Sequence, residues 1–237
     1  MNLLAIDASS LPASCAFYRG DVLVAEEYVH NKMTHSQTLM PMVQHMLQTA
    51  GATLEEADLV AVTVGPGSFT GLRIGIASAK GMAFGCGKPC LPVSTLETLA
   101  WNCLCHKGVV CAVMDARCAQ VYTALFESDG LGGLTPMGQD EALPLAQLKE
   151  RLAALEQPVM LVGDGALLCY NSLENKENVV PAPPALRFQR ASSLGMAALA
   201  ALERGVQPIA AEELAPTYLR LPQAERELLQ KQAAQNK

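Results

Sequence analysis

The sequence has few aromatic residues, a shortage of basic charge and no long apolar run. Aromatic residues make up 5% of its 237 positions while half of all residues are hydrophobic, so the core must be built mainly from aliphatic side chains. Lys and Arg number 17 against 23 Asp and Glu, which gives a net charge of −6. A protein that binds nucleic acid by itself usually carries a basic excess. The acidic balance argues against an autonomous nucleic-acid-binding protein, although the chain could still act on RNA through a partner.

Signals for export or membrane insertion are also lacking. The first ten residues contain no basic region, and Asp7 interrupts their apolar stretch. No run approaches the roughly 20 apolar residues of a spanning helix. We therefore expect a cytoplasmic protein that has no membrane contact.

Cysteine is present, but the spacing of a metal site is not. None of the eight cysteines forms a CxxC pair, and in a chain of this length most should be small buried side chains. Cys103, Cys105 and His106, with Cys111 nearby, do not match the usual zinc patterns. We assign no metal site to them.

The most informative stretch is residues 59–87, LVAVTVGPGSFTGLRIGIASAKGMAFGCG. It opens as an apolar, β-branched run that predicts a buried strand. The strand breaks at residues 65–67, where Gly-Pro-Gly cannot continue it. Ser68 and Thr70 can then cap a helix that extends to about residue 85.

That helix carries small residues in two stripes. An interior glycine costs a helix about 1 kcal/mol relative to alanine, so packing must compensate. Close packing within the chain's own fold is the first interpretation, and contact with another subunit is the second. The sequence leaves both open, and the two can hold on different stripes. The first stripe is Gly71, Gly75, Ala79 and Ala83, and the second is Ala77, Gly81 and Gly85.

The whole chain reads as alternating strands and helices, with a flexible glycine loop at 130–133. We expect capping by Thr34 with Gln37, by Ser94 and by Ser192. Strands are expected at 3–6, 14–18, 22–29, 59–64, 89–93, 109–114, 120–126, 158–162 and 179–180, and helices at 34–50, 71–85, 95–105, 145–155, 166–173 and 193–203.

The two halves follow a similar order. Each begins with an apolar strand that ends in an aspartate, Asp7 or Asp115, and continues through a hairpin. This pattern suggests an internal duplication. We expect an N-terminal lobe at 1–106, a shortened C-terminal lobe at 107–215, and a C-terminal strand with a polar tail at 216–237.

These segments together resemble the bacterial TsaB (YeaZ) family. Residues 65–83, GPGSFTGLRIGIASAKGMA, look like its signature, and LLAIDAS, VSTLETLA, MDAR and APTYLR also fit. The resemblance implies the α/β fold of the actin-like, sugar-kinase and Hsp70 (ASKHA) superfamily. That fold has two duplicated lobes of mixed sheet flanked by helices, here with the second lobe shortened.

The resemblance also implies a function. The chain would be an accessory, non-catalytic subunit for forming the threonylcarbamoyl group on the adenosine 3′ of the anticodon, in tRNAs that read codons beginning with A. It would form a heterodimer with the catalytic paralogue TsaD and work with TsaE, while TsaC acts in the same pathway. It would be a homodimer when alone and meet tRNA only through the complex.

The catalytic and metal-binding residues of the paralogue are not matched. TsaD carries a metal-binding HxxxH motif, and its two histidine positions align with Thr95 and Leu99. Threonine ligates a metal only weakly and leucine cannot, so we predict no catalytic and no metal-binding residue in this chain.

The nucleotide-binding features are eroded as well. Superfamily members that bind ATP place glycine two residues after the first aspartate, where this chain has Ser9 or Arg117. The segment GPGSFTG also lacks the GK[ST] ending of a phosphate loop, although its helix N-terminus could hold an anion. We expect no cofactor on the chain alone, and ATP or ADP are candidates for binding in the multi-subunit complex. The candidate anion or nucleotide contacts are Asp7, Ser9, Ser68, Thr70, Asp115, Arg117, Gly163 and Gly165.

The predicted partner surface consists of the helices at 34–50 and 71–85, which would dock on the same helices of TsaD. A bulky residue at Gly75 is then expected to weaken the heterodimer and leave the fold intact. The alternative function is a stand-alone degenerate kinase-like enzyme or a peptidase acting on TsaD, but no Gly-x-Ser-x-Gly elbow is present. The interface candidates are Leu39, Met40, Val43, Met46, Leu47, Gly71, Gly75, Ser78, Ala79 and Met82.

Overall fold

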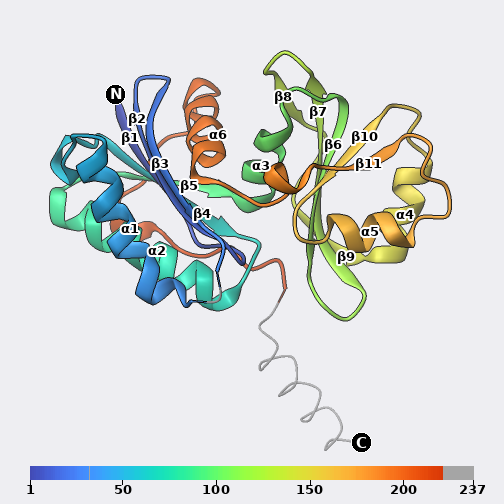
Figure 1. The fold of residues 1–237 in the computed structure, drawn as a ribbon, viewed down its shortest axis with the longest axis horizontal. Coiled ribbons are helices and arrows are strands. Elements are labelled where there is room, and N and C mark those ends of the chain that lie inside the picture. The colour runs from blue at the N-terminus through green and yellow to red at the C-terminus, as the bar shows by residue number, and fades with distance from the viewer. Residues whose placement is uncertain (32, 221–237) are drawn as a thin grey trace, which may run out of the picture.

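The structure is a computed structural model that describes residues 1–31 and 33–220 of the chain. It has two lobes, each built on one β-sheet with helices on both faces (Figure 1). The tail expected from residue 221 onward lies outside the described residues.

The first sheet has five strands in the order β3-β2-β1-β4-β5. β1, β2 and β3 form an antiparallel meander, and β4 and β5 join β1 through parallel pairing. β1 and β4 are apolar along almost their whole length because both faces of the sheet are covered. The bounds are β1 (Asn2–Asp7), β2 (Ala13–Arg19), β3 (Val22–Val29), β4 (Leu59–Gly65) and β5 (Cys90–Ser94).

The second sheet repeats this plan with shorter outer strands. Its order is β11-β10-β6-β7-β8, and β9 also pairs with β7. As in the first sheet, the strand that ends in an aspartate makes an antiparallel hairpin on one side and a parallel pair on the other. β8 and β9 were not predicted. The bounds are β6 (Lys107–Asp115), β7 (Gln120–Asp129), β8 (Leu134–Pro136), β9 (Glu141–Pro144), β10 (Val159–Val162) and β11 (Val179–Pro181).

Two helices cover one face of each sheet. α1 (His35–Thr49) and α2 (Phe69–Cys86) lie on the first sheet, and α4 (Leu145–Ala153) and α5 (Ala166–Ser172) lie on the second (Figure 1). The apolar spacing that predicted these helices is the spacing of their buried side chains. Each lobe therefore has a closed aliphatic core on this face.

The opposite faces are covered by an exchange of helices. α6 (Ala191–Glu203), which comes after the second sheet in sequence, packs on β1 and β2 of the first. α3 (Thr95–Ala100), which comes before the second sheet, packs on β6 and β7 of that sheet. The expected lobe boundaries at 106 and 215 therefore need correction. We use "first lobe" for the first sheet with α1, α2 and α6, and "second lobe" for the second sheet with α3, α4 and α5.

The segment after α6 also returns to the first lobe. Ile209 forms a bridge with Cys90, and the backbone N–H of Thr217 donates to the carbonyl of Val64 at 2.8 Å. The strand expected from residue 216 is not formed in the described part, 216–220. The short 3₁₀ turns of the chain are η1 (Leu54–Glu56), η2 (Trp101–Cys103), η3 (Pro184–Leu186) and η4 (Ala211–Glu213).

Of the five residues predicted to cap helices, two do so and three do not, and Thr70 is among the three because it lies inside α2. The hydroxyl of Ser68 accepts from the N–H of Gly71, and that of Ser94 accepts from two N–H groups of α3. Thr34 makes no side-chain cap bond, so the predicted capping box is absent. Ser192 is not a cap because α6 begins one residue earlier, at Ala191.

Candidate functional site

The carboxyl ends of β1 and β6 face a pocket between the two lobes. The pocket has a volume of about 420 Å³ and is lined from both lobes, by Ser10 and Ser68 on one side and Asp115, Arg117 and Asp164 on the other. This is where an α/β fold of this kind offers a binding crevice.

Asp7, which ends β1, is turned into the protein. Its side chain is fully buried and accepts hydrogen bonds from the backbone N–H and the hydroxyl of Ser9, both at 3.1 Å. The amide of Gln189 donates to the same hydroxyl at 3.1 Å. Burial raises the pKa of the Asp7 carboxyl, because desolvation disfavours the charged form. The predicted contacts Asp7 and Ser9 therefore bond to each other within the protein.

The N-terminus of α2 lies directly against the turn that follows Asp7. A Cβ atom at Gly71 would overlap the carbonyl oxygen of Ala8, and one at Gly67 would overlap that of Ser9. The N–H of Ser68 donates to the Ser9 carbonyl at 2.7 Å. This close approach explains the two glycines by packing, and the predicted contacts Ser68 and Thr70 line pockets beside it.

Asp115, which ends β6, is more open. Its side chain is 30% exposed, accepts from the backbone N–H of Arg117 at 2.8 Å and forms an ion pair with the Arg117 guanidinium at 3.3 Å. The turn after it is strained, since Arg117, Cys118 and Ala119 have φ values of 62°, 54° and 55°. Side chains other than glycine rarely adopt this left-handed conformation in succession.

Gly163 and Gly165 lie against the end of β6. Gly163 has a φ of 115°, and a Cβ atom there would overlap the Val113 carbonyl. At Gly165 a Cβ atom would be 3.0 Å from the N–H nitrogen of Asp115. Both glycines thus allow the segment to approach β6 closely, which is a structural reason for their presence.

Asp164, between these glycines, was not singled out from the sequence. Its carboxylate accepts from the N–H of Asp115 at 3.0 Å and from the hydroxyl of Ser10, in the first lobe, at 3.2 Å. Burial raises the pKa of this carboxyl, and the nearby Asp115 charge raises it further. Its position directly after a buried strand, flanked by two glycines, is the signal that could have identified it.

Thr95 and Leu99 lie in the interior of the protein. Both are fully buried, and Leu99 is part of the apolar cluster under the second sheet. The Thr95 hydroxyl has no hydrogen-bond partner. No group of three potential metal-ligating side chains occurs in the described residues 1–31 and 33–220.

The predicted partner face on α1 and α2 is only partly at the surface. Met40 is 44% exposed and Ser78 is half-buried. The other eight candidates are buried in the first lobe: Leu39, Val43, Met46, Leu47, Gly71, Gly75, Ala79 and Met82.

The two small-residue stripes of α2 have opposite surroundings. The first stripe faces the core, and a Cβ atom at Gly75 would already be 3.3 Å from that of Ala8. A bulky residue at Gly75 would therefore disturb the fold, and the test suggested by the sequence needs another position. Ala77, Gly81 and Gly85 of the second stripe are exposed and line a shallow groove of about 600 Å³ with Met40, Leu54, Ser78, Met82 and Cys86.

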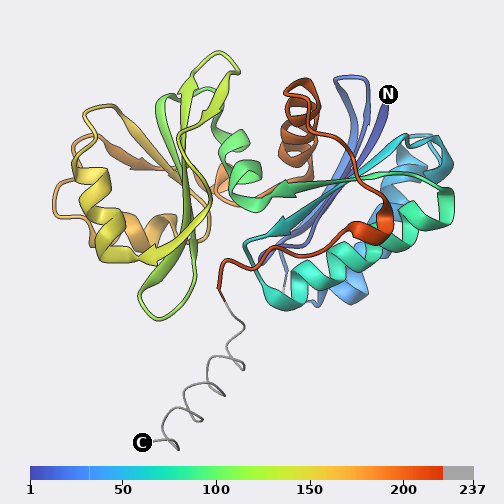
Figure 2. The same ribbon diagram turned by 180° about the vertical axis from the view of Figure 1, so that it is seen from behind.

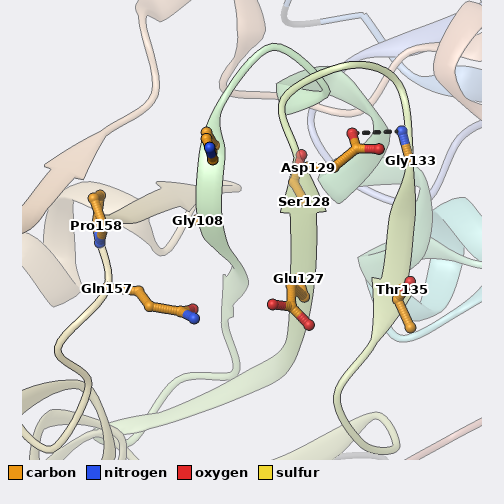
Figure 3. A pocket seen from close by; sticks show the side chains of 9 residues that line it. Gly108, Glu127, Ser128, Asp129, Gly133, Thr135, Gln157 and Pro158 are labelled. Carbon is orange, nitrogen blue, oxygen red and sulfur yellow. Dashed lines mark hydrogen bonds between the residues drawn. The ribbon is translucent and has the colours of Figure 1, made fainter.

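Another concavity lies at the end of the second sheet away from the cleft. It has a volume of about 540 Å³, and Figure 3 shows Glu127, Gln157 and Thr135 around it. The Asp129 carboxylate accepts from the N–H of Gly133 at 2.9 Å and so belongs to its own loop. None of the site residues predicted from the sequence lines this pocket.

Comparison with known proteins supports the family suggested by the motifs. The family model described as TsaD, tRNA N6-adenosine threonylcarbamoyltransferase, matches residues 26–228. A protein of Bacillus subtilis (strain 168) named tRNA threonylcarbamoyladenosine biosynthesis protein TsaB is 32% identical over 232 residues, covering 98% of this chain and 100% of the relative. The chain belongs to the TsaB (YeaZ) family. The resemblance read from the sequence motifs is therefore confirmed.

Solved structures agree with this assignment. YeaZ from Pseudomonas aeruginosa is 29% identical, with a TM-score of 0.78 over 92% of this chain and 99% of that chain. Component A of the (R)-2-hydroxyglutaryl-CoA dehydratase of Acidaminococcus fermentans has a TM-score of 0.51 at 13% identity, covering 87% of this chain and 100% of that chain. This likeness concerns the fold alone, and with the two repeated sheets it confirms the ASKHA architecture expected for a TsaB protein.

One further finding concerns membranes. No helix within residues 1–31 and 33–220 combines the length and the apolar character that a bilayer span requires.

Proposed function

We propose that this chain is a subunit of the machinery that forms threonylcarbamoyladenosine in tRNA, and that it acts by binding a TsaD-type partner. Its family membership supports the pathway, because the Bacillus relative is named for that biosynthesis. The partner has the same ancestry, since the TsaD family model also matches most of this chain.

The observation that carries the proposal is the exposed stripe of α2. Ala77, Gly81 and Gly85 leave the helix backbone uncovered beside Met40, which is 44% exposed, and Phe84, which is 68% exposed. Small residues flanked by large apolar ones allow a second helix to approach closely and bury area at its edges. A sister helix of TsaD fits this surface, and so does a second copy of the chain when TsaD is absent.

The cleft supports a non-catalytic role. The Asp7 carboxylate is enclosed by Ser9, and the α2 N-terminus fills the space beside its turn. Thr95 and Leu99 supply no strong metal ligand. We infer that the chemistry, and any ATP or ADP, belong to the complex with TsaD and TsaE, and that an acidic chain of net charge −6 meets tRNA through that complex.

Reconstitution of the modification with and without this chain tests the proposal. Modified adenosine should form only when the chain is present with the other pathway proteins, and the chain alone should form none. Undiminished modification without the chain would refute the proposal. Tight stoichiometric ATP binding by the isolated chain, measured by calorimetry, would favour the kinase-like alternative instead.

The interface is tested by Gly81→Leu, with Gly138→Leu as the matched control. Both glycines have open space around the Cβ position and neither has a positive φ, but Gly138 lies in the second lobe. Light scattering should show loss of the complex with TsaD for Gly81→Leu and a normal complex for the control. Equal assembly of both variants would mean that the exposed stripe is not the interface.

A further inference from the structure

The segment that follows α6 crosses from one lobe to the other. It leaves the end of α6, passes along α2 and reaches the mouth of the cleft, as the red segment in Figure 2 shows. Three of its last described residues, Thr217, Tyr218 and Arg220, make specific contacts there. Tyr218 and Arg220 also line the pocket between the lobes.

Its attachment to the first lobe uses both backbone and side chains. Thr217 donates its N–H to the Val64 carbonyl at 2.8 Å. The Tyr218 ring stacks on Phe69 with 5.2 Å between centroids, and its hydroxyl accepts from Nε of Arg73 at 3.1 Å. The Arg73 guanidinium in turn lies 3.8 Å from the Phe69 ring centroid. Tyr218 is thus fixed on the first turns of α2.

Its attachment to the second lobe is made by Arg220. The guanidinium donates to the carbonyl of Ala116 at 2.7 Å. Ala116 directly precedes the three residues with positive φ, and such a turn persists only where its surroundings hold it. The other hydrogen bonds of this turn come from the second lobe itself. They include those from the Arg117 N–H to the Asp115 carboxylate, from the Leu145 N–H to the Ala119 carbonyl, and between the backbones of Ala116, Arg117 and Gln120. Arg220 therefore stabilises this turn from outside the second lobe, through a hydrogen bond that the C-terminal segment supplies.

We propose that residues 217–220 form a clasp that fixes the angle between the lobes and the width of the cleft. Other side-chain hydrogen bonds also cross between the lobes: Ser10 to Asp164, Ser94 to Asp140, Arg204 at the end of α6 to Glu97 of α3, and Ser193 of α6 to Asn102 directly after α3. The clasp differs from all four because it lies on a chain segment that can be withdrawn without unfolding either sheet. A partner that takes hold of this segment would free the second lobe to rotate and open the pocket.

The test measures the distance between the lobes in the isolated chain. Spin labels are placed at Gln48 of α1 and Gln147 of α4 through a non-canonical amino acid, because the exposed thiols of Cys105 and Cys118 would also react. A chain ending at residue 216 loses the clasp, and a chain ending at residue 220 keeps it. Double electron–electron resonance should give the same narrow distribution for the full chain and the 1–220 chain. The 1–216 chain should give a broader distribution at longer distances.

Arg220→Ala isolates the contact with the second lobe, and Arg151→Ala is its control. Arg151 makes two hydrogen bonds with Glu141 inside the second lobe, so its loss should leave the distance unchanged. Hydrogen exchange of the amides at 117–120 should be about tenfold faster in Arg220→Ala, because a charged hydrogen bond on this turn is lost. Arg220→Lys keeps a donor and should restore part of the protection.

Three outcomes would overturn the clasp. One is an unchanged distance distribution in the 1–216 chain, and another is an equal change in the 1–220 chain, which would assign the effect to residues after 220. If the 1–216 chain does not fold, unaltered exchange at 117–120 in Arg220→Ala is decisive against it. Because the test uses the chain without TsaD, its result is independent of the proposed function.

Discussion

Asp7 and Asp115 hold the same place in the two lobes and have opposite surroundings. Asp7 is fully buried, with Ser9 bonded to it and the N-terminus of α2 packed on its turn. Asp115 is partly exposed, and its turn contains three residues in the left-handed conformation. In the first lobe this end of the sheet is covered by α2. In the second lobe it is exposed, and Arg220 of the C-terminal segment binds its turn. Strand ends in equivalent positions thus form a packing contact in one lobe and an exposed turn in the other.

The largest expected effect compares the glycines that pack on these two strand ends. Gly71→Ala should lower the free energy of unfolding by about 3 kcal/mol, because the added methyl group meets a backbone carbonyl that cannot move away. Gly165→Ala should cost about 1 kcal/mol, since its Cβ atom would be 3.0 Å from the nearest backbone atom. Chemical denaturation measures both. Equal losses would mean that the two ends are packed alike.

The next comparison concerns the exchanged helices. The first turn of α6 is held by Glu26 of the first sheet, which accepts from the N–H of Ser192 at 2.9 Å and pairs with Arg190 at 2.8 Å. Glu26→Ala should cost about 2 kcal/mol, because several charge-assisted hydrogen bonds are lost together. α3 is capped by its own Ser94, whose hydroxyl also donates to Asp140, and Ser94→Ala should cost about 1.5 kcal/mol because both contacts are lost. A larger loss for Ser94→Ala, in the same denaturation experiment, would contradict this order.

A pH dependence of opposite sign is expected for Asp7→Asn in the first lobe and Asp129→Asn in the second. Burial raises the folded-state pKa of Asp7, so wild type loses stability as pH rises from the unfolded pKa, about 4, through the folded one. The free energy of unfolding of Asp7→Asn should therefore increase relative to that of wild type as pH rises. Hydrogen bonds from Leu131 and Gly133 lower the pKa of Asp129. Its contribution to stability is therefore present above the unfolded pKa and is lost as pH falls through the folded pKa.

The free energy of unfolding of Asp129→Asn should accordingly decrease relative to that of wild type as pH rises from about 3 to 5. Thermal unfolding of the three proteins over this range and up to pH 7 gives both differences. If the two variants changed in the same direction, the contrast between a desolvated and a hydrogen-bonded carboxylate would be refuted.

The smallest expected effect concerns the strained turn itself. Cys118 is exposed and has a φ of 54°, a conformation that glycine adopts without steric cost. Cys118→Gly should stabilise the chain by about 0.5 kcal/mol, after the greater backbone freedom of unfolded glycine is subtracted. Gly20→Ala provides the converse in the first lobe, where φ is 64° in the β2–β3 turn, and should destabilise by about 1 kcal/mol. Denaturant midpoints that move in the same direction would contradict the prediction.

Local features of the sequence predicted much of the fold. Apolar periodicity located every strand of the two sheets except β8 and β9, and the hydroxyls of Ser68 and Ser94 marked two helix starts, because these signals act within a few residues. The two stripes of α2 were also evident, but their pattern could not tell which one faced the core. Which stripe faces the core is decided by distant residues, since Ala8 and His35 lie against Gly71 of the first stripe.

The remaining features arise from contacts between distant parts of the chain. The cap of α6 comes from Glu26, 166 residues away, and the bond between Ser10 and Asp164 spans 154 residues. Chain order placed α6 with the second sheet because no local signal says which sheet a helix will cover. For the same reason Arg220 was not among the predicted site residues.

The exchange of α3 and α6 has a consequence for synthesis on the ribosome. Every element of the second lobe lies between residues 95 and 186, so this lobe can complete both faces of its sheet once that stretch has emerged. The first sheet keeps one apolar face bare until residues 191–203 follow it out of the exit tunnel. The lobe that is translated first is therefore the one that is completed last.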